Sequence, residues 1–276
     1  MEQARAAEVT RRQLTEALAA ASPAERVDVL ACAHADLVRW RYRLALRIDR
    51  RVGLGIEYDP SRFATPMLAG EENYDRIGFV GRFRDGASWD AATRTFRGGR
   101  ETPAFRIMLA YGRLAEERFA REGNTGETLQ NTVMLPSGAR IPGNSLVRGV
   151  TAERCAAELL ARITRRGVDA SHVETGGSPM YVLTAQPESR DRMFAAALGL
   201  LAAAAPGDVK AWQAARYLLY QAPRTKKGSD AVTRTFLVAT GAVLFGHAPV
   251  LDQDIDLRCM VLGQEAATTA PSDPPV

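Results

Sequence analysis

Cysteine is scarce in this chain. The 276 residues include only Cys32, Cys155 and Cys259, which lie more than 100 residues apart and form no C-x-x-C pair. Disulfide-stabilised secreted domains and structural zinc sites both depend on clustered cysteines. The pattern therefore predicts neither of them, and it fits a protein of the reducing cytoplasm.

Long apolar runs are also missing. The longest one, residues 193–205, is shorter than the roughly 20 residues that a helix needs to cross a bilayer. Residues 1–12 mix acidic and basic side chains with alanine and lack the apolar core of a signal peptide. We therefore expect a cytoplasmic protein with no membrane partner.

The net charge is small. The formal charge is +4, and 46% of the residues are hydrophobic and 25% are charged. These proportions are close to those of average globular proteins, and the charge falls short of the strong positive field of a dedicated DNA-binding domain. A small anionic ligand fits this balance at least as well as a polynucleotide does.

Helix signals dominate the sequence. Alanine- and leucine-rich stretches with capping residues predict helices at residues 2–21, 22–48, 102–121, 151–166, 187–206, 210–221 and 229–245. Residues 38–48 also alternate apolar and polar side chains, so this segment fits either a helix or a strand. The expected fold is mainly α, a multi-helix orthogonal bundle with one or two small β-hairpins.

Short strands are expected between the helices. Residues 132–135 and 140–141 flank the turn Pro136-Ser137-Gly138 and predict a hairpin. Residues 76–83 are predicted to pair with residues 93–96 around Asp85-Gly86. Residues 180–184 have strand character, and residues 250–262 are expected to be extended.

Composition suggests three segments along the chain. Residues 1–52 are predicted to form an N-terminal helical segment, and residues 53–264 the main helical domain with its hairpins. Residues 265–276 are small and contain proline, so we expect a disordered tail there.

Lysine is the rarer basic residue, and its placement marks a candidate site. Lysine and arginine together number 36, but lysine occurs only at positions 210, 226 and 227. The adjacent pair lies in the segment 224–234, RTKKGSDAVTR, directly before an apolar helix. A helix N-terminus presents unpaired N–H groups and a positive dipole end, which favour phosphate or carboxylate. The segment is therefore predicted to bind an anion.

The neighbours of the lysine pair supply further parts of such a site. Gly228 permits a close approach of the backbone, and the hydroxyl groups of Ser229 and Thr233 can donate hydrogen bonds. The predicted ligand-binding residues are Arg224, Lys226, Lys227, Gly228, Ser229, Thr233 and Arg234. A solvated loop between two helices, with Asp230 interacting with the helix dipole, is the alternative.

The segment from Trp212 to Phe245 resembles the Fic/Doc fold. It consists of a helix, a charged turn with Gly228-Ser229-Asp230, and an apolar helix that carries Arg234 in its second turn. The family motif is H-P-F-x-x-G-N-G-R-x-x-R between two helices. The resemblance implies that the loop binds nucleotide phosphates and that a β-hairpin, here the one at 132–141, acts as a flap over the target.

The sequence departs from that motif at two positions. Pro223 stands where the family has its catalytic histidine, and Ala231 stands where it has the first arginine. The resemblance therefore implies phosphate binding more than AMP transfer. The role of general base would pass to Asp230 or to a lysine whose pKa is lowered by its like-charged neighbour.

Three aspartates alternate near the C-terminus. On a strand, Asp252, Asp254 and Asp256 would share one face, and Asp254 with Asp256 could bind Mg²⁺. With the preceding Gly246-His247, the pattern resembles the signature of minimal nucleotidyltransferases, although His247 replaces the usual serine and the spacer is shorter. An exposed polar face of an edge segment is the alternative.

Residues 39–51 carry a run of arginines with Trp40 and Tyr42 between them. Such a basic and aromatic surface could contact RNA or an acidic protein. A solvated helix face explains the same residues equally well.

Three function hypotheses follow. The first is a group transferase that binds a nucleotide or another phosphate-bearing small molecule at 224–234, with Asp230 as the candidate catalytic residue; a nucleotide, with or without Mg²⁺, is the cofactor that this predicts. The second is a non-catalytic module that binds nucleic acid or an acidic partner through residues 39–51. The third is a metal-dependent nucleotidyltransferase that uses Asp254 and Asp256.

Overall fold

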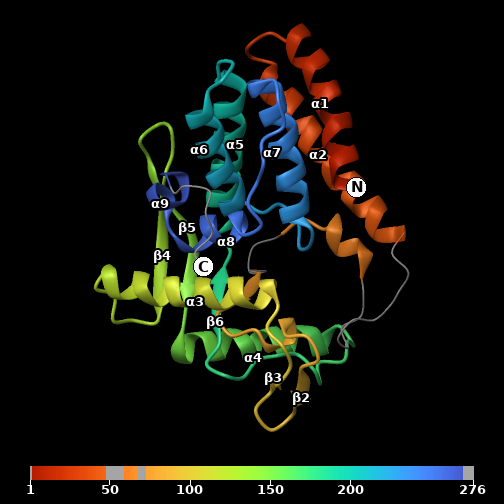
Figure 1. Ribbon diagram of the computed structural model, residues 1–276. Helices are drawn as coiled ribbons and strands as arrows, with labels where there is room; N and C mark the ends of the chain where they lie inside the picture. Colours follow the sequence, from red (N-terminus) through yellow and green to blue (C-terminus); the bar gives the residue numbers. More distant parts are fainter. Residues whose placement is uncertain (1, 48–58, 68–72, 270–276) are drawn as a thin grey trace.

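The computed structural model describes residues 2–47, 59–67 and 73–269. These residues are mostly helical, but they also contain a four-stranded antiparallel sheet and a separate two-stranded hairpin (Figure 1). The helical majority was predicted from the sequence. The four-stranded sheet was not, so the fold is a mixture of helices and sheet and not a bundle with isolated hairpins.

The elements have the following bounds. The α-helices are α1 (Glu2–Ala20), α2 (Arg26–Arg47), α3 (Pro103–Arg121), α4 (Gly149–Arg165), α5 (Pro187–Ala203), α6 (Val209–Gln221), α7 (Ser229–Phe245), α8 (Ile255–Val261) and α9 (Gln264–Thr269). The strands are β1 (Tyr74–Ile77), β2 (Ser88–Asp90), β3 (Thr95–Arg97), β4 (Thr128–Met134), β5 (Arg140–Val147) and β6 (Met180–Leu183), and two short 3-10 helices are η1 (Pro60–Phe63) and η2 (Gly81–Phe83).

Five helices, α1, α2, α5, α6 and α7, form one layer of the molecule, in the upper half of Figure 1. Apolar side chains from each of them meet in a common core, for example Leu14, Leu30, Met193, Tyr217 and Phe236. The N-terminal helices therefore pack onto the helices that follow the sheet in the sequence. This core fixes the directions of α6 and α7, and with them the position of the loop between these two helices.

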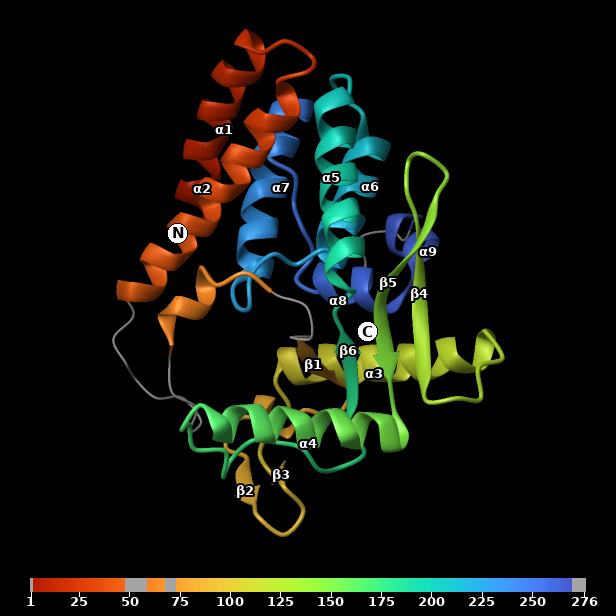
Figure 2. The same ribbon diagram turned by 180° about the vertical axis from the view of Figure 1, so that it is seen from behind.

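The sheet and two further helices form the other layer. The strand order is β1-β6-β5-β4, and all neighbours are antiparallel. Successive side chains of a strand point to opposite faces: Val182 packs with Phe119 of α3, whereas Tyr181 packs with Ala156 of α4. The views from opposite sides show α3 and α4 crossing the two faces of the sheet (Figure 1 and Figure 2).

One predicted strand pairing is confirmed and another is wrong. The hairpin at 132–141 exists as β4 and β5, with Val133 opposite Ile141. Residues 76–83 do not pair with 93–96, because β1 pairs with β6, where Tyr74 lies opposite Leu183, and β3 pairs with β2. The partner of β1 lies more than 100 residues further along the chain, where no local turn signal indicates it.

The ambiguous segment 38–48 is helical as far as the structure describes it. Residues 38–47 continue α2, and Ala45 within them is buried on the same helical face as the preceding Leu30, His34 and Leu37. Packing on one side of the segment therefore decides between the two periods. None of the helices in the described part of the chain is long and apolar enough to span a bilayer.

The C-terminal region differs from its predicted form. Residues 250–262 are not extended, because residues 255–261 form α8. Residues 265–269, expected in a disordered tail, belong to α9, where Ala267 is fully buried and the Gln264 side chain bonds both backbone groups of Met134 on β4. Burial of Ala267 in the core of the helical layer and the bonds to β4 stabilise this short helix; residues 270–276 lie outside the described residues.

Candidate functional site

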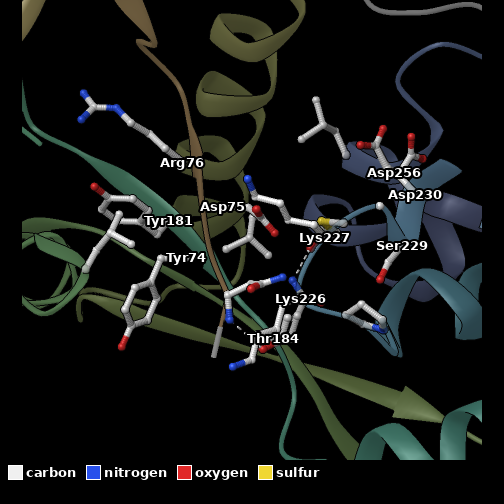
Figure 3. Close-up of a pocket in the computed structure, with 18 of the residues that line it drawn as sticks. Tyr74, Asp75, Arg76, Tyr181, Thr184, Lys226, Lys227, Ser229, Asp230 and Asp256 are labelled. Carbon is white, nitrogen blue, oxygen red and sulfur yellow. Dashed lines mark hydrogen bonds between the residues drawn. The ribbon is translucent and has the colours of Figure 1, made fainter. Parts of the chain in front are cut away.

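A cavity of about 630 Å³ lies where the helical layer meets the sheet. We call it the central cavity. Figure 3 shows Asp75 and Tyr181 of the sheet on one side of it, Ser229, Asp230 and Asp256 of the helical layer on the other, and the two lysines between them. The walls come from β1, β6, α4, α8 and the loop between α6 and α7, so segments distant in the sequence meet here.

The predicted ligand-binding residues divide into two groups. Lys226, Lys227, Gly228 and Ser229 line the central cavity, as does Asp230. The other three do not line it: Arg224, Thr233 and Arg234.

The three residues outside the central cavity have structural contacts. Arg224 pairs with Asp191 of α5, and the Thr233 side chain is buried. Arg234 donates to the backbone carbonyls of Asp252 and Gln253, both at 2.7 Å, and so holds the chain that enters α8.

A glycine caps the N-terminus of α7. Gly228 is the N-cap residue, and it has a φ of +78°, a conformation that favours glycine. The Ser229 hydroxyl donates to the carbonyl oxygen of Thr225 at 2.9 Å, which closes the loop on itself. The serine hydroxyl is therefore occupied within the loop, and the first turn of α7 meets the cavity through Gly228, Ser229 and Asp230.

The loop before α7 is held by residues of η1 and the turn after it. The backbone N–H groups of Lys226 and Lys227 donate to the carbonyls of Thr65 and Arg62 at 3.2 and 3.1 Å. The lysine side chains are therefore carried by an anchored backbone, which preorganises them for a ligand.

Positive charges are crowded around Lys227. Burial and the nearby guanidinium groups of Arg62 and Arg166 lower the pKa of Lys227, and Asp59 opposes the shift in part. Arg62 belongs to η1 and Arg166 caps the C-terminus of α4, so they reach the site from separate elements. An anion bound among these groups would stabilise all of them.

Two carboxyl groups on the cavity wall have strongly raised pKa values. Asp75 of β1 faces the cavity, but protein surrounds the cavity on most sides and partly excludes water from this carboxyl group. This desolvation raises the pKa of Asp75 to about 6, although the charge of Arg82 acts in the opposite direction. Burial and the charge of Asp230 raise the pKa of Asp256 to about 6, with Arg234 opposing. Carboxyl groups with such values can exchange protons near neutral pH.

Asp230, the predicted catalytic residue, is less suited to that role than these two. Its Oδ1 accepts from Nε of Arg234 at 2.8 Å and from the hydroxyl of Tyr220 at 3.3 Å. These two donors already occupy this oxygen. No local motif marks Asp75 in the sequence, and sequence reasoning missed it.

The expected aspartate face at the C-terminus does not form. Asp254 is the N-cap residue of α8 and Asp256 lies in its first turn, where residues two apart differ by roughly 200° in direction. Asp254 is buried and accepts from the hydroxyl of Tyr111 at 2.6 Å, with Arg258 at 3.5 Å. The strand geometry behind the metal prediction is therefore wrong, and no cluster of three or more metal-binding side chains occurs among the described residues.

Comparison with known proteins adds no family. No model of a protein family matches the chain, and no curated protein matches its sequence.

The predicted flap does not cover the central cavity with its tip. Gln264 of α9 bonds the backbone of Met134, at 2.7 and 2.9 Å, near the end of the hairpin. Only the other end of the hairpin reaches the cavity, through Asn144 of β5. This arrangement differs from the flap that the Fic/Doc resemblance implies.

The basic face of α2 is partly engaged. Arg39 pairs with Asp36, and the guanidinium of Arg41 lies 4.2 Å from the centre of the Phe63 ring. Arg43 and Arg47 are exposed. Residues 48–51, the rest of the predicted basic face, lie outside the described residues.

The raised pKa of Asp256 predicts a pH-dependent stability. The folded protein holds this proton up to about pH 6, whereas the unfolded chain releases it near pH 3.8. Stability conferred by the protonated carboxyl is therefore lost as the pH rises from about 4 through 6. Asparagine does not ionise, so Asp256→Asn removes the cost of a charged carboxylate at this position. We expect the variant to have a free energy of unfolding about 2 kcal/mol higher at pH 7.5.

Urea denaturation of both proteins at pH 7.5, 6 and 4.5 measures this difference, which should shrink steadily toward the lowest pH. A variant that is less stable at pH 7.5 would show that the ion pair of Asp256 with Arg234, at 3.4 Å, outweighs the cost of burial.

Proposed function

We propose that the protein is a group transferase that binds a phosphate-bearing small molecule, such as a nucleotide, in the central cavity. The observation that carries the proposal is the meeting of Lys226, Lys227, Arg62 and Arg166 with the N-terminus of α7 at the central cavity. Cationic side chains and helix N–H groups are the two devices that proteins use to bind phosphate. The three cysteines are free, which suits a cytoplasmic protein.

Transfer chemistry is supported by the acidic residues of the same cavity. A group transferase needs a proton acceptor for the hydroxyl or amine that attacks the donor. Asp75 and Asp256, each with a pKa of about 6, supply this acceptor. The Fic/Doc motif would supply a histidine for this role, but Pro223 occupies that position here.

The lysine pair provides the test. We expect a screen of nucleotides, sugar phosphates and coenzymes by thermal unfolding to give at least one compound that raises the Tm. Lys226→Ala combined with Lys227→Ala should weaken its binding at least about 100-fold, because each lost charge-assisted hydrogen bond costs about 1.5–3 kcal/mol. Isothermal titration calorimetry of the parent and the double variant measures the loss.

Lys210→Ala is the matched control. It removes the third lysine of the chain, which is exposed on α6 and does not line the cavity, so binding should be unchanged. A ligand that binds the double lysine variant as tightly as the parent would refute the proposed site, and a screen without any phosphate-bearing hit would refute the proposed ligand class.

A further inference from the structure

A second hollow of about 550 Å³ continues from the central cavity along the end of α4. We call it the outer groove. Its cationic lining consists of Arg62, Arg162, Arg165, Arg166, Lys226 and Lys227. Four of these also line the central cavity, whereas Arg162 and Arg165 belong to the outer groove alone. The lysine pair and Arg166 thus stand at the junction of the two spaces.

The wall beside α4 is an ordered structure. The guanidinium of Arg162 lies 4.3 Å from the centre of the Tyr74 ring, and the Tyr74 hydroxyl donates to Glu158 at 2.6 Å. Both Arg162 and Tyr74 line the groove, and the stacking of the guanidinium on the ring orders the Arg162 side chain there.

Basic residues in the last turn of a helix also stabilise its C-terminus. That effect accounts for the presence of Arg162 and Arg165 at the end of α4. It does not account for Arg62, Lys226 and Lys227, which come from other segments and face the same groove. The shared placement of all of them is what indicates a ligand.

Acidic residues are distributed in the opposite way. Asp230 and Asp256 line the central cavity but not the outer groove, where Asp75 at the junction is the one acidic side chain among the described lining residues. A ligand with several negative charges is therefore attracted into the outer groove and repelled from the far side of the central cavity. The apolar side chains of Val182 and Met260 line the central cavity and suit an uncharged group.

We propose that the ligand carries a chain of two or more phosphates that lies in the outer groove, with its uncharged part in the central cavity. This inference rests on the proposed function and names the class of its donor: a polyphosphate ester such as a nucleoside diphosphate or triphosphate. The terminal phosphates contact Arg162 and Arg165, and the phosphate nearest the ester contacts the lysine pair.

The test uses phosphate chains without a nucleoside. Titration calorimetry in low salt without divalent metal compares orthophosphate, pyrophosphate and tripolyphosphate. We expect each added phosphate to tighten binding about tenfold. Arg162→Gln combined with Arg165→Gln should reduce tripolyphosphate binding about 100-fold, to near the level of orthophosphate, and leave orthophosphate binding within twofold of the parent.

Two further variants make the result specific. Arg154→Gln changes an exposed arginine of the same helix that does not line the groove, and it should preserve the gain with chain length. Arg165→Gln alone changes an exposed side chain, which avoids the loss of the Arg162 contact with Tyr74, and it should remove about tenfold of the tripolyphosphate affinity.

The outcomes separate the two proposals. Orthophosphate binding that depends on Lys226 and Lys227, without a gain from longer chains or with a gain that survives the arginine changes, overturns the polyphosphate inference alone. Absence of binding by all three phosphates overturns this inference and the proposed function together.

Discussion

Gly228→Ala should destabilise the protein by about 2 kcal/mol and abolish ligand binding in the central cavity. Gly228 has a φ of +78°, and an alanine in this left-handed conformation costs about 1–2 kcal/mol. Its Cβ would also lie 2.6 Å from Cδ1 of Phe63 and 3.0 Å from Cγ of Arg41. The buried Phe63 ring, on which Arg41 stacks, has little room to yield.

The loss of binding follows from the position of this residue. Gly228 joins the lysine pair to the first turn of α7, so a shift of its backbone moves the ammonium groups and the helix N–H groups apart. Differential scanning calorimetry, with and without the ligand from the screen, measures both the stability and the ligand-induced rise in Tm.

Gly246→Ala is a matched control at the other end of α7. Gly246 has a φ of +73°, but no atom lies within 4 Å of the position that a Cβ would occupy. The control should lose about 1 kcal/mol from the backbone conformation alone and bind ligand as the parent does. Equal behaviour of the two variants would show that the contact with Phe63 does not set the loop geometry.

Glu174→Ala is expected to cost about 3 kcal/mol of stability. The Glu174 carboxylate is fully buried and accepts from the backbone N–H groups of Gly81 and Arg82 at 2.8 and 3.3 Å. It also lies 3.7 Å from the Arg82 guanidinium. Removing it leaves a buried N–H group unpaired and Arg82 without this partner, and breaking a buried pair from one side is strongly destabilising.

Urea denaturation measures this cost, and Asp85→Ala serves as the comparison. Asp85 pairs with Arg100 at 2.6 Å on the surface, where both side chains are mostly exposed, so its loss should cost less than about 1 kcal/mol. A Glu174 variant no more affected than the Asp85 variant would mean that water readily replaces the buried carboxylate.

The candidate site could be predicted from the sequence only in part. The rarity of lysine pointed to Lys226 and Lys227, and the following helix start pointed to N–H groups beside them. Arg62, Arg166 and Asp75 carry no local signal, because each is an ordinary residue of its own segment. They meet at the cavity because η1, β1 and the end of α4 lie beside the α6–α7 loop.

For the aspartates near the C-terminus, a local pattern predicted a site that the tertiary structure does not form. Alternating Asp254 and Asp256 fit a strand with one acidic face, but Tyr111 and Arg258 bind Asp254 at the start of a short helix. Tyr111, on α3, donates its hydrogen bond from a position 143 residues before Asp254 in the sequence. A period of two residues could not reveal this partner.

By itself, the sequence determined the local features. These are most helices, including the one predicted at 102–121, and the β4–β5 hairpin. At the start of that helix, the Thr102 hydroxyl accepts from the Phe105 N–H. These depend on interactions between residues a few positions apart, which composition and spacing record. Only the tertiary structure decided the pairing of β1 with β6, the helix α8 and the collection of cations around Lys227. Such features depend on burial and charge contributed by distant segments, and they exist only once the helical layer and the sheet have packed together.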